Sequence, residues 1–274
     1  MSSISNEELR QVCAKTRRLI MDMIYQAGSG HVGGALSVVE IIATLYYRIL
    51  KIDPSDPRWE NRDRFILSKG HAGPALYAIL ALVGYFPEAE LMTLNHDGTN
   101  LPSHADMRRT RGIDMTTGAL GQGLSAAVGM ALSAKMDRRA NRVFVLLGDG
   151  ELNEGQNWEA AMTAAKYRLN NLIAVVDDNK LQIDGTCSEV MPLEPLTAKW
   201  TSFGWKVLEV DGHDLDRLTE TFNEAATVGD APVVVLAYTH KGRGISFAED
   251  QVASHNMRLT QEQWEQSRRD LAGA

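Results

Sequence analysis

Hydrophobic residues recur at helical spacing from the start of the chain, where Ser5 and two acids in the next turn are typical of a helix start. The positions that continue this spacing are Leu9, Val12, Thr16, Leu19, Ile20 and Met23. This helix is predicted to end at a glycine-rich loop, residues 28–34, which carries His31. A second helix is predicted over residues 37–50, and the Pro-containing linker 53–57 closes it.

Apolar runs rich in β-branched residues predict the strands of a sheet. They cover residues 65–67, 143–147, 172–176, 205–210 and 233–238. Helices are predicted from the small-residue segment opening at 118–123, around 158–167, over 214–227, and in a short amphipathic tail within 259–271. Strand, helix, strand is the βαβ pattern of a parallel sheet. We therefore predict one three-layer α/β domain over residues 1–274, with a mainly parallel sheet flanked by helices.

Composition and charge narrow the possible partners. The 274 residues carry a formal net charge of −7, which offers no general attraction to nucleic acid or to an anionic membrane. The basic clusters Arg17–Arg18 and Arg108–Arg109–Arg111 are short, so they are expected to be mostly solvated surface. The start of the chain is too polar for a signal peptide, and no run of about 18 apolar residues predicts a membrane span. Cys13 and Cys187 fit neither a metal-ligand spacing nor a disulfide framework, so a reducing, cytoplasmic setting is expected.

Candidate chemistry follows two neighbouring predicted strands. Asp149 has a glycine on each side, so the backbone can turn sharply and leave the carboxylate facing a pocket beyond the strand end. Asn179 follows the next strand, so that an amide oxygen can converge on this carboxylate. Hard oxygen ligands of this kind, together with diphosphate oxygens, are what Mg²⁺ prefers. Two ordinary turns are the alternative interpretation of the same residues.

Longer motifs extend this interpretation. The GDG at 148–150, followed by 28 residues and then Asn179, resembles the diphosphate motif of thiamine-diphosphate enzymes. Over nearly the whole chain, five motifs resemble those of the transketolase family. In chain order they are SGHVGG (29–34), SKGHA (68–72), TTGALGQG (116–123), GDGELNEGQNWEA (148–160) and KGRGISFAED (241–250).

The resemblance implies a role for each matching residue. The implied metal ligands are Asp149, the side chain of Asn179 and the backbone carbonyl of Leu181. The implied cofactor contacts are His71, Gly118, Leu120, Gly150, Asn179, Lys241 and His255. The implied catalytic residues are His31, His104 and His255, which would hydrogen-bond sugar hydroxyls and help to move protons, and Glu154, which matches an acid at the interface between subunits. Histidine suits proton transfer because its ordinary pKa of about 6.5 lies near neutrality.

Some residues lie outside the motifs or depart from them. His96, His213 and His240 are expected to be surface or locally hydrogen-bonded residues. The family's Pro after the first histidine is Val32 here, and its late Trp-His-Gly is Ser254-His255-Asn256, with the distance from Lys241 kept. Gly34 stands where many relatives have a hydroxyl residue.

The resemblance also implies a reaction and a partner. Transketolases transfer a two-carbon ketol unit from a ketose, usually phosphorylated, to an aldose with thiamine diphosphate and Mg²⁺. The family's pyrimidine-binding and C-terminal domains are absent from this sequence, so we expect them on a partner chain, most simply in an α₂β₂ assembly.

Three alternatives stay open. Another thiamine-diphosphate enzyme component, such as a 2-oxo acid dehydrogenase subunit or a deoxyxylulose-phosphate synthase, would share the GDG site but not the SGHVGG and KGRGIS loops. The second is a non-catalytic cofactor-binding subunit, against which the retained histidines argue. The third is a specialised enzyme for an unusual ketose phosphate, such as a branched or sulfonated one.

Overall fold

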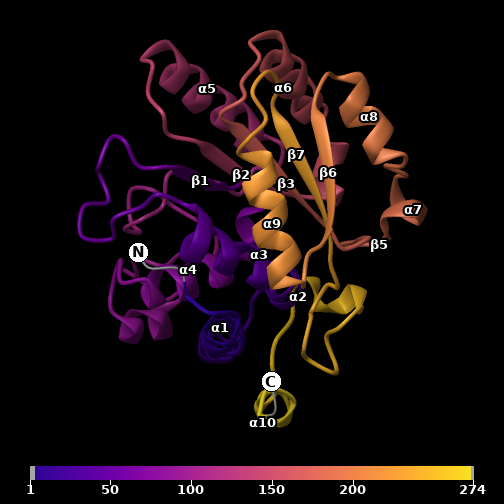
Figure 1. The fold of residues 1–274 in the computed structure, drawn as a ribbon. Helices are drawn as coiled ribbons and strands as arrows, with labels where there is room; N and C mark the ends of the chain where they lie inside the picture. Colours follow the sequence, from indigo (N-terminus) through magenta and orange to yellow (C-terminus); the bar gives the residue numbers. More distant parts are fainter. Residues whose placement is uncertain (1–3, 273–274) are drawn as a thin grey trace.

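A five-stranded parallel sheet forms the centre of the molecule (Figure 1). The computed structural model describes residues 4–272. The strands are β1 (Arg64–Leu67), β2 (Val143–Gly148), β3 (Leu172–Asp178), β6 (Lys206–Asp211) and β7 (Val233–Tyr238), in the spatial order β1-β2-β3-β7-β6. Every neighbouring pair is parallel. The predicted parallel sheet is therefore confirmed, and a small antiparallel pair, β4 (Leu181–Gln182) and β5 (Gly185–Thr186), lies outside it.

Side chains alternate along the strands between two hydrophobic cores. On β2, Phe144 and Leu146 belong to one core, whereas Val145 and Leu147 belong to the other. The helices that cover the first face are α1 (Asn6–Ala27), α3 (Val39–Thr44), α4 (Gly73–Leu82) and α9 (Leu215–Ala225). Those that cover the second face are α5 (Gln122–Met136), α6 (Gly155–Lys166) and α8 (Leu196–Ser202). This arrangement confirms the predicted three-layer α/β fold.

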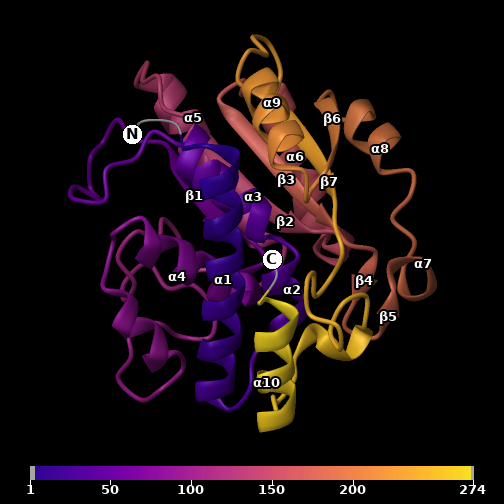
Figure 2. The same ribbon diagram turned by 60° about the horizontal axis from the view of Figure 1, so that its bottom comes forward.

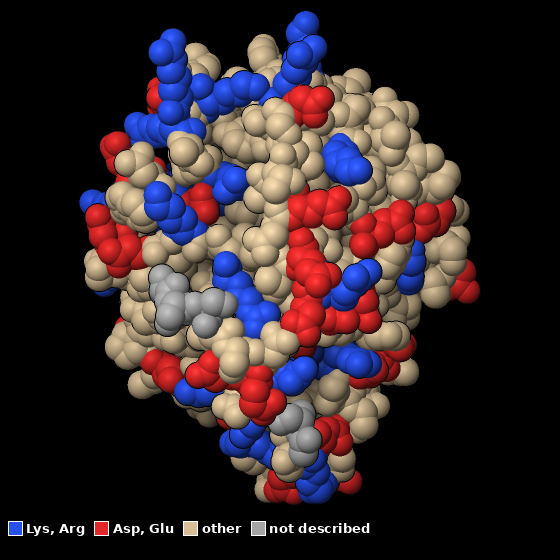
Figure 3. Space-filling model, in the orientation of Figure 1, with Lys and Arg blue, Asp and Glu red and all other residues tan. Residues whose placement is uncertain are grey.

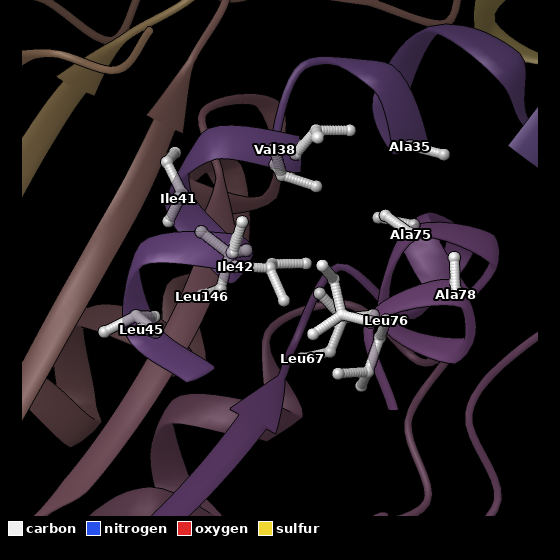
Figure 4. Packing of buried hydrophobic residues seen from close by; sticks show 14 of the residues in the cluster. Ala35, Val38, Ile41, Ile42, Leu45, Leu67, Ala75, Leu76, Ala78 and Leu146 are labelled. Atoms are coloured by element: carbon white, nitrogen blue, oxygen red, sulfur yellow. The ribbon is translucent and has the colours of Figure 1, made fainter. Parts of the chain in front are cut away.

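The first core includes the contact between α3 and α4. Figure 4 shows Ile42 of α3 beside Leu76 of α4, with Leu67 and Leu146 from the strand ends nearby. All four side chains are almost completely buried, and each contributes roughly 1.5–3 kcal/mol of hydrophobic stabilisation. A helix was expected after His71 but without bounds, because α4 is buried on nearly all sides and so lacks an amphipathic period.

The glycine-rich segment after α1 is helical where a loop was predicted. α2 (Val32–Leu36) begins directly after His31, and the chain continues through α3 into a π-helical turn at Leu45–Ile49. The predicted loop over 28–34 and the single helix over 37–50 are therefore wrong in their boundaries. The reason is tertiary, because a Cβ at Gly33 would lie 2.3 Å from the Ser254 Oγ. Only a residue without a side chain lets α2 pack against that distant segment.

By length and composition, the segment Val32–Ile49 is apolar enough to cross a membrane, which the sequence analysis did not recognise. In the structure 83% of this segment is buried inside the fold. α3 packs against α1, α4 and α9. Burial in a core therefore accounts for its apolar composition.

The first and last helices of the described chain pack together. α10 (Gln261–Asp270) lies alongside α1 (Figure 2), where the rings of Tyr25 and Trp264 stack at 5.0 Å. The Trp264 indole also donates to Asp22 at 2.8 Å. The predicted amphipathic tail helix is thus confirmed.

On the face in Figure 3, acidic side chains run down the centre, and Lys and Arg gather towards the top.

Candidate active site

All five strands end along one edge of the sheet. The segments that follow them are 68–71 after β1, 149–150 after β2, 179–181 after β3, 212–213 after β6 and 239–241 after β7. Ligands bind at the carboxyl edge of parallel sheets because the polar segments of several strands meet there. Motifs that are far apart in the sequence therefore lie at one site.

Asp149 is a buried carboxylate held by backbone amides. Its Oδ1 accepts a hydrogen bond from the Gly150 N–H at 2.7 Å, and its Oδ2 accepts one from the Lys180 N–H at 2.6 Å. Burial, together with the charge of nearby Asp177, raises the pKa of Asp149 to about 6. Within residues 4–272, Lys69 pairs with Asp177 and Lys180 with Asp178, and no Lys, Arg or His forms an ion pair with Asp149. The Asp149 carboxylate therefore has no cationic side-chain partner among the described residues.

Asp177, which the sequence analysis did not single out, organises this edge. Its carboxylate accepts hydrogen bonds from the Ser37 hydroxyl at 2.7 Å, the Asn179 amide at 2.9 Å and the Thr239 hydroxyl, and it pairs with the Lys69 ammonium. Burial favours the neutral acid, but the Lys69 charge and these donors hold the pKa of Asp177 below its ordinary value. In the sequence, Asp177, Asp178 and Asn179 look like equivalent polar residues. Only the geometry of the strand end shows which partners each of them binds.

The oxygen atoms near Asp149 are of the types that a divalent cation binds. Asn179 and Leu181 line the same pocket as Asp149, so a carboxylate, an amide oxygen and a backbone carbonyl are brought together. These are the ligand types that Mg²⁺ prefers. The Leu181 carbonyl already accepts from the Lys241 ammonium at 3.1 Å. The predicted set is thus assembled in one place, and its metal-binding role stays a prediction.

The pocket at this edge has a volume of about 170 Å³. Its lining includes Gly34, Lys69, His71, Leu120, Asp149, Gly150, Asn179, Leu181, Lys241 and His255. Most of the cofactor contacts predicted from the motifs therefore meet here. A Cβ on Gly150 would lie 3.1 Å from the Gln182 side chain, so the glycine keeps this approach to the backbone open.

Four histidines from separate segments form a cluster, and two of them, His71 and His255, line the pocket. The ring of His31 lies 5.4 Å from that of His71, 5.5 Å from that of His104 and 5.4 Å from that of His255. The His71 and His255 rings are 5.2 Å apart, and the Lys241 Nζ lies 3.2 Å from the His255 Nδ1. The motif histidines thus form one cluster, as the resemblance implied.

The cluster is neutral at pH 7. Burial, reinforced by the other histidines and by nearby lysine charges, lowers the pKa of His31 and of His255 to about 4. Burial also lowers the pKa of His71 and of His104. Burial, together with the like charge of Lys69, lowers the pKa of Lys241 to about 8. A neutral imidazole has one N–H and one free nitrogen, so it can both donate to and accept from a hydroxyl group.

The loop at 118–123 closes the other side of the pocket. Gly118 lies against the His104 ring, and Gly121, at φ +85°, lies so close to Glu154 that a Cβ would approach its side chain to 2.6 Å. Buried Glu151, which sequence reasoning missed, accepts from the amides of this loop and of the GDG turn at 2.9 and 3.0 Å. Glu154 itself is exposed beside the loop, and its role at an interface stays a prediction.

Arg17, which was expected at the surface, is buried, and His213, which was expected to be at the surface or locally hydrogen-bonded, is hydrogen-bonded and largely covered. The Arg17 guanidinium donates to both oxygens of the Glu40 carboxylate at 2.6 and 2.8 Å. His213 lies 2.9 Å from the same carboxylate, with 9% of its side chain exposed. The sequence could not reveal their common partner, because Glu40 comes from a different helix. His96 and His240 are exposed, as expected.

Comparison with known families decides what kind of domain this is. Residues 9–273 match the model of the transketolase, thiamine diphosphate binding domain family. The chain belongs to the transketolase family. This membership favours the transketolase interpretation over other thiamine-diphosphate enzymes.

Single subunits of transketolases are among the similar sequences. The chain is 56% identical over 248 residues to the 6-deoxy-6-sulfo-D-fructose transketolase subunit of Clostridium sp. (strain MSTE9), with 90% of each chain covered. It is 40% identical over 266 residues to an apulose-4-phosphate transketolase subunit of Phocaeicola vulgatus, covering 97% of this chain and 94% of that one. These relatives are subunits of about the same length as this chain.

Solved transketolases share the fold. The transketolase from Campylobacter jejuni superposes with a TM-score of 0.92 at 28% identity, covering 98% of this chain. The chain spans 43% of the length of that transketolase. It therefore corresponds to one part of the longer enzyme, as the motifs implied.

The departures from the transketolase pattern are accommodated locally. His255 stays in the histidine cluster although its neighbours are Ser254 and Asn256, and Ser254 is buried against α2. A Cβ at Gly34 would lie 3.0 Å from the His71 ring. A side chain at this position would push against the His71 ring. Gly34 therefore leaves the space that the ring occupies.

Proposed function

We propose that this chain is the thiamine-diphosphate-binding subunit of a two-chain transketolase that transfers a two-carbon ketol unit from a ketose to an aldose and uses Mg²⁺. One observation carries the proposal: four neutral histidines and Lys241 converge above a buried carboxylate that has no cation partner within residues 4–272. Two ordinary turns, the simpler alternative, would give no reason for this convergence.

The residues present divide the binding of the cofactor between them. Thiamine diphosphate, when bound, supplies the carbanion chemistry of ketol transfer. Asp149, the Asn179 side chain and the Leu181 carbonyl would hold Mg²⁺, which in turn binds diphosphate oxygens. The Gly150 backbone and the Lys241 ammonium would contact the diphosphate directly, because both residues line the same pocket.

The histidines would handle the sugar. His31, His104 and His255 would hydrogen-bond its hydroxyl groups and move protons at their ring nitrogens. Their neutrality supports this role, because an imidazolium could only donate. Backbone groups of Gly118 and Leu120 would face the pyrimidine side of the cofactor.

A specialised ketose is the donor that the relatives favour. The relative at 56% identity is named for 6-deoxy-6-sulfo-D-fructose and others are named for apulose 4-phosphate. We infer that this subunit serves a sulfonated or similarly unusual ketose, with pentose phosphates as the general alternative.

The partner would carry the pyrimidine-binding and C-terminal domains. We propose an α₂β₂ assembly in the cytoplasm, because a cofactor between two kinds of chain is most simply built that way. Relatives named as subunits support the need for a partner.

The test is transfer by the reconstituted pair. The chain is co-expressed with its partner, and transfer to ribose 5-phosphate is measured from 6-deoxy-6-sulfo-D-fructose, apulose 4-phosphate and xylulose 5-phosphate, with each chain alone as control. We expect transfer only in the mixture, fastest with the sulfonated donor. Asp149→Ala should abolish it, whereas the exposed-site control Asp97→Ala should not.

The same assay separates the alternatives. Cofactor binding without transfer from any donor would favour a non-catalytic subunit. Fastest transfer from xylulose 5-phosphate would replace the specialised donor with a pentose phosphate. Absence of thiamine diphosphate binding by the mixture would contradict the proposed function as a whole.

A further inference from the structure

Arg17, Glu40 and His213 form a buried polar group outside the pocket described above. The Glu40 carboxylate is shared by the Arg17 guanidinium, at 2.6 and 2.8 Å, and by the His213 Nδ1, at 2.9 Å. None of the three lines the candidate pocket. Burying a charged pair is costly and seldom gains stability over a well-packed apolar one. The arrangement therefore suggests a task beyond holding α1 to α3.

The group ends on the loop that carries Lys241. The His213 Nε2 accepts a hydrogen bond from the His240 backbone N–H at 2.9 Å. The Arg17 Nε donates to the backbone carbonyl of Arg243 at 3.0 Å. Both contacts hold backbone rather than side chains, and they lie on either side of Lys241. The buried group thus fixes the path of the main chain from which Lys241 projects.

The pattern of donors determines the tautomer of His213. A backbone N–H can only donate, so the Nε2 that accepts from His240 carries no hydrogen. The ring hydrogen then lies on Nδ1, where it is donated to the Glu40 carboxylate. His213 therefore connects the buried carboxylate to the loop through its two ring nitrogens.

Lys241 itself is aimed at the pocket. Its Nζ donates to the Leu181 carbonyl at 3.1 Å and lies 3.2 Å from the His255 Nδ1. Further along the loop, the Gly242 N–H donates to the Gly33 carbonyl at 3.0 Å. A shift of the backbone at 240 would therefore move the ammonium away from both Leu181 and His255.

We propose that His213 is a positioning residue that holds the backbone next to Lys241 so that the ammonium reaches the cofactor's diphosphate. Glu40, fixed by Arg17, sets the orientation of the imidazole. This inference rests on the proposed function, because it depends on Lys241 contacting the diphosphate. It adds a residue from the end of β6 that touches neither cofactor nor metal.

Two isosteric variants separate the two hydrogen bonds of His213. The amide of His213→Asn can reach only the position of Nδ1, so this variant keeps the bond to Glu40 and loses the acceptor for the His240 N–H. His213→Gln places its amide oxygen near the position of Nε2 and keeps that acceptor. His96→Ala, which changes an exposed loop histidine, is the matched control.

The first readout is hydrogen exchange in the full chain without cofactor, over a peptide spanning 239–250. We expect exchange in His213→Asn to be about tenfold faster at this peptide, as local opening becomes easier, and unchanged at β2 and β3. His213→Gln and His96→Ala should match wild type. Equal exchange in all variants would overturn the proposal, as would faster exchange spread evenly over the fold.

The second readout is binding of thiamine diphosphate with Mg²⁺ to the complex with the partner subunit. We expect the dissociation constant to rise by up to about tenfold in His213→Asn, the size expected when one hydrogen bond is lost, and to be restored in His213→Gln. If wild type binds and His213→Asn binds equally well, only the positioning role is lost. If wild type does not bind, the proposed function fails and takes this role with it.

Discussion

At the scale of single residues, burial sets the charge of the active-site histidines. The pKa of His31 and of His255 is lowered to about 4, mainly by burial, against an ordinary value near 6.5. Histidine NMR titration of the unliganded chain should therefore give two midpoints near pH 4. A midpoint near 6.5 for both rings would contradict the packed cluster.

The same shift links stability to pH. Because the folded pKa lies below the unfolded one, the unfolded chain takes up protons first as pH falls. The stability contributed by His31 and His255 is fully present above about pH 6.5 and is lost as pH falls towards 4. A variant with Asn at both positions should therefore lose less melting temperature between pH 6.5 and 4 than wild type does.

The buried pair of Lys69 and Asp177 predicts a large and asymmetric effect on stability. Both side chains are almost fully buried and their charges are paired. Asp177→Asn leaves the Lys69 ammonium without its counter-charge and should destabilise the fold by about 3–5 kcal/mol in chemical denaturation. Adding Lys69→Met should recover much of the loss. If the two single changes simply add, the pair is not coupled as the structure indicates.

At the scale of an element, α5 combines a close contact and an open position on one helix. A Cβ on Gly123 would lie 2.2 Å from the Ser68 Oγ and 2.8 Å from its Cα, whereas a Cβ on Gly129 meets nothing within 4 Å. Gly123→Ala should destabilise the chain by about 1–3 kcal/mol, because the start of α5 must move away from β1. Gly129→Ala should stabilise it by roughly 0.5–1 kcal/mol through helix propensity.

Thermal unfolding of the two glycine variants provides its own control, because the same substitution is made twice on one helix. Opposite signs are expected. Equal and small effects would show that α5 does not approach Ser68 as closely as described.

At the scale of the whole molecule, two exposed apolar side chains lie at the mouth of a polar pocket. Ile183 is 61% exposed and Leu120 is 37% exposed, and both line the pocket with Asp149. Large exposed side chains beside a polar site are typical of an interface. We predict that the partner subunit covers them.

Ile183→Asp tests this surface. It should weaken association with the partner by about tenfold or more, as at a buried apolar contact, without lowering the melting temperature of the isolated chain. Met136→Asp is the control and should bind the partner normally. Met136 is the last residue of α5 and is 75% exposed. Light scattering of the purified mixtures would measure both, and equal association would place the partner elsewhere.

The sequence by itself determined the class of this protein. Apolar runs alternating with helical periods predicted the parallel sheet, and the motifs around His31, His71, Asp149 and Lys241 predicted the family, because both are written in local spacing. Helix boundaries near Gly33 and the bounds of the all-buried α4 could not be predicted, since there the deciding contacts come from distant segments or surround the helix.

Only the tertiary structure decided which polar residues act together. Asp177 is indistinguishable from Asp178 along the chain, yet it alone gathers Lys69, Ser37 and Asn179. Arg17 and His213 show no common partner along the chain, and only folding brings Glu40 between them. A charged side chain is tolerated in the interior only when its partner is present, and that partner is chosen by three-dimensional proximity, which sequence spacing does not record.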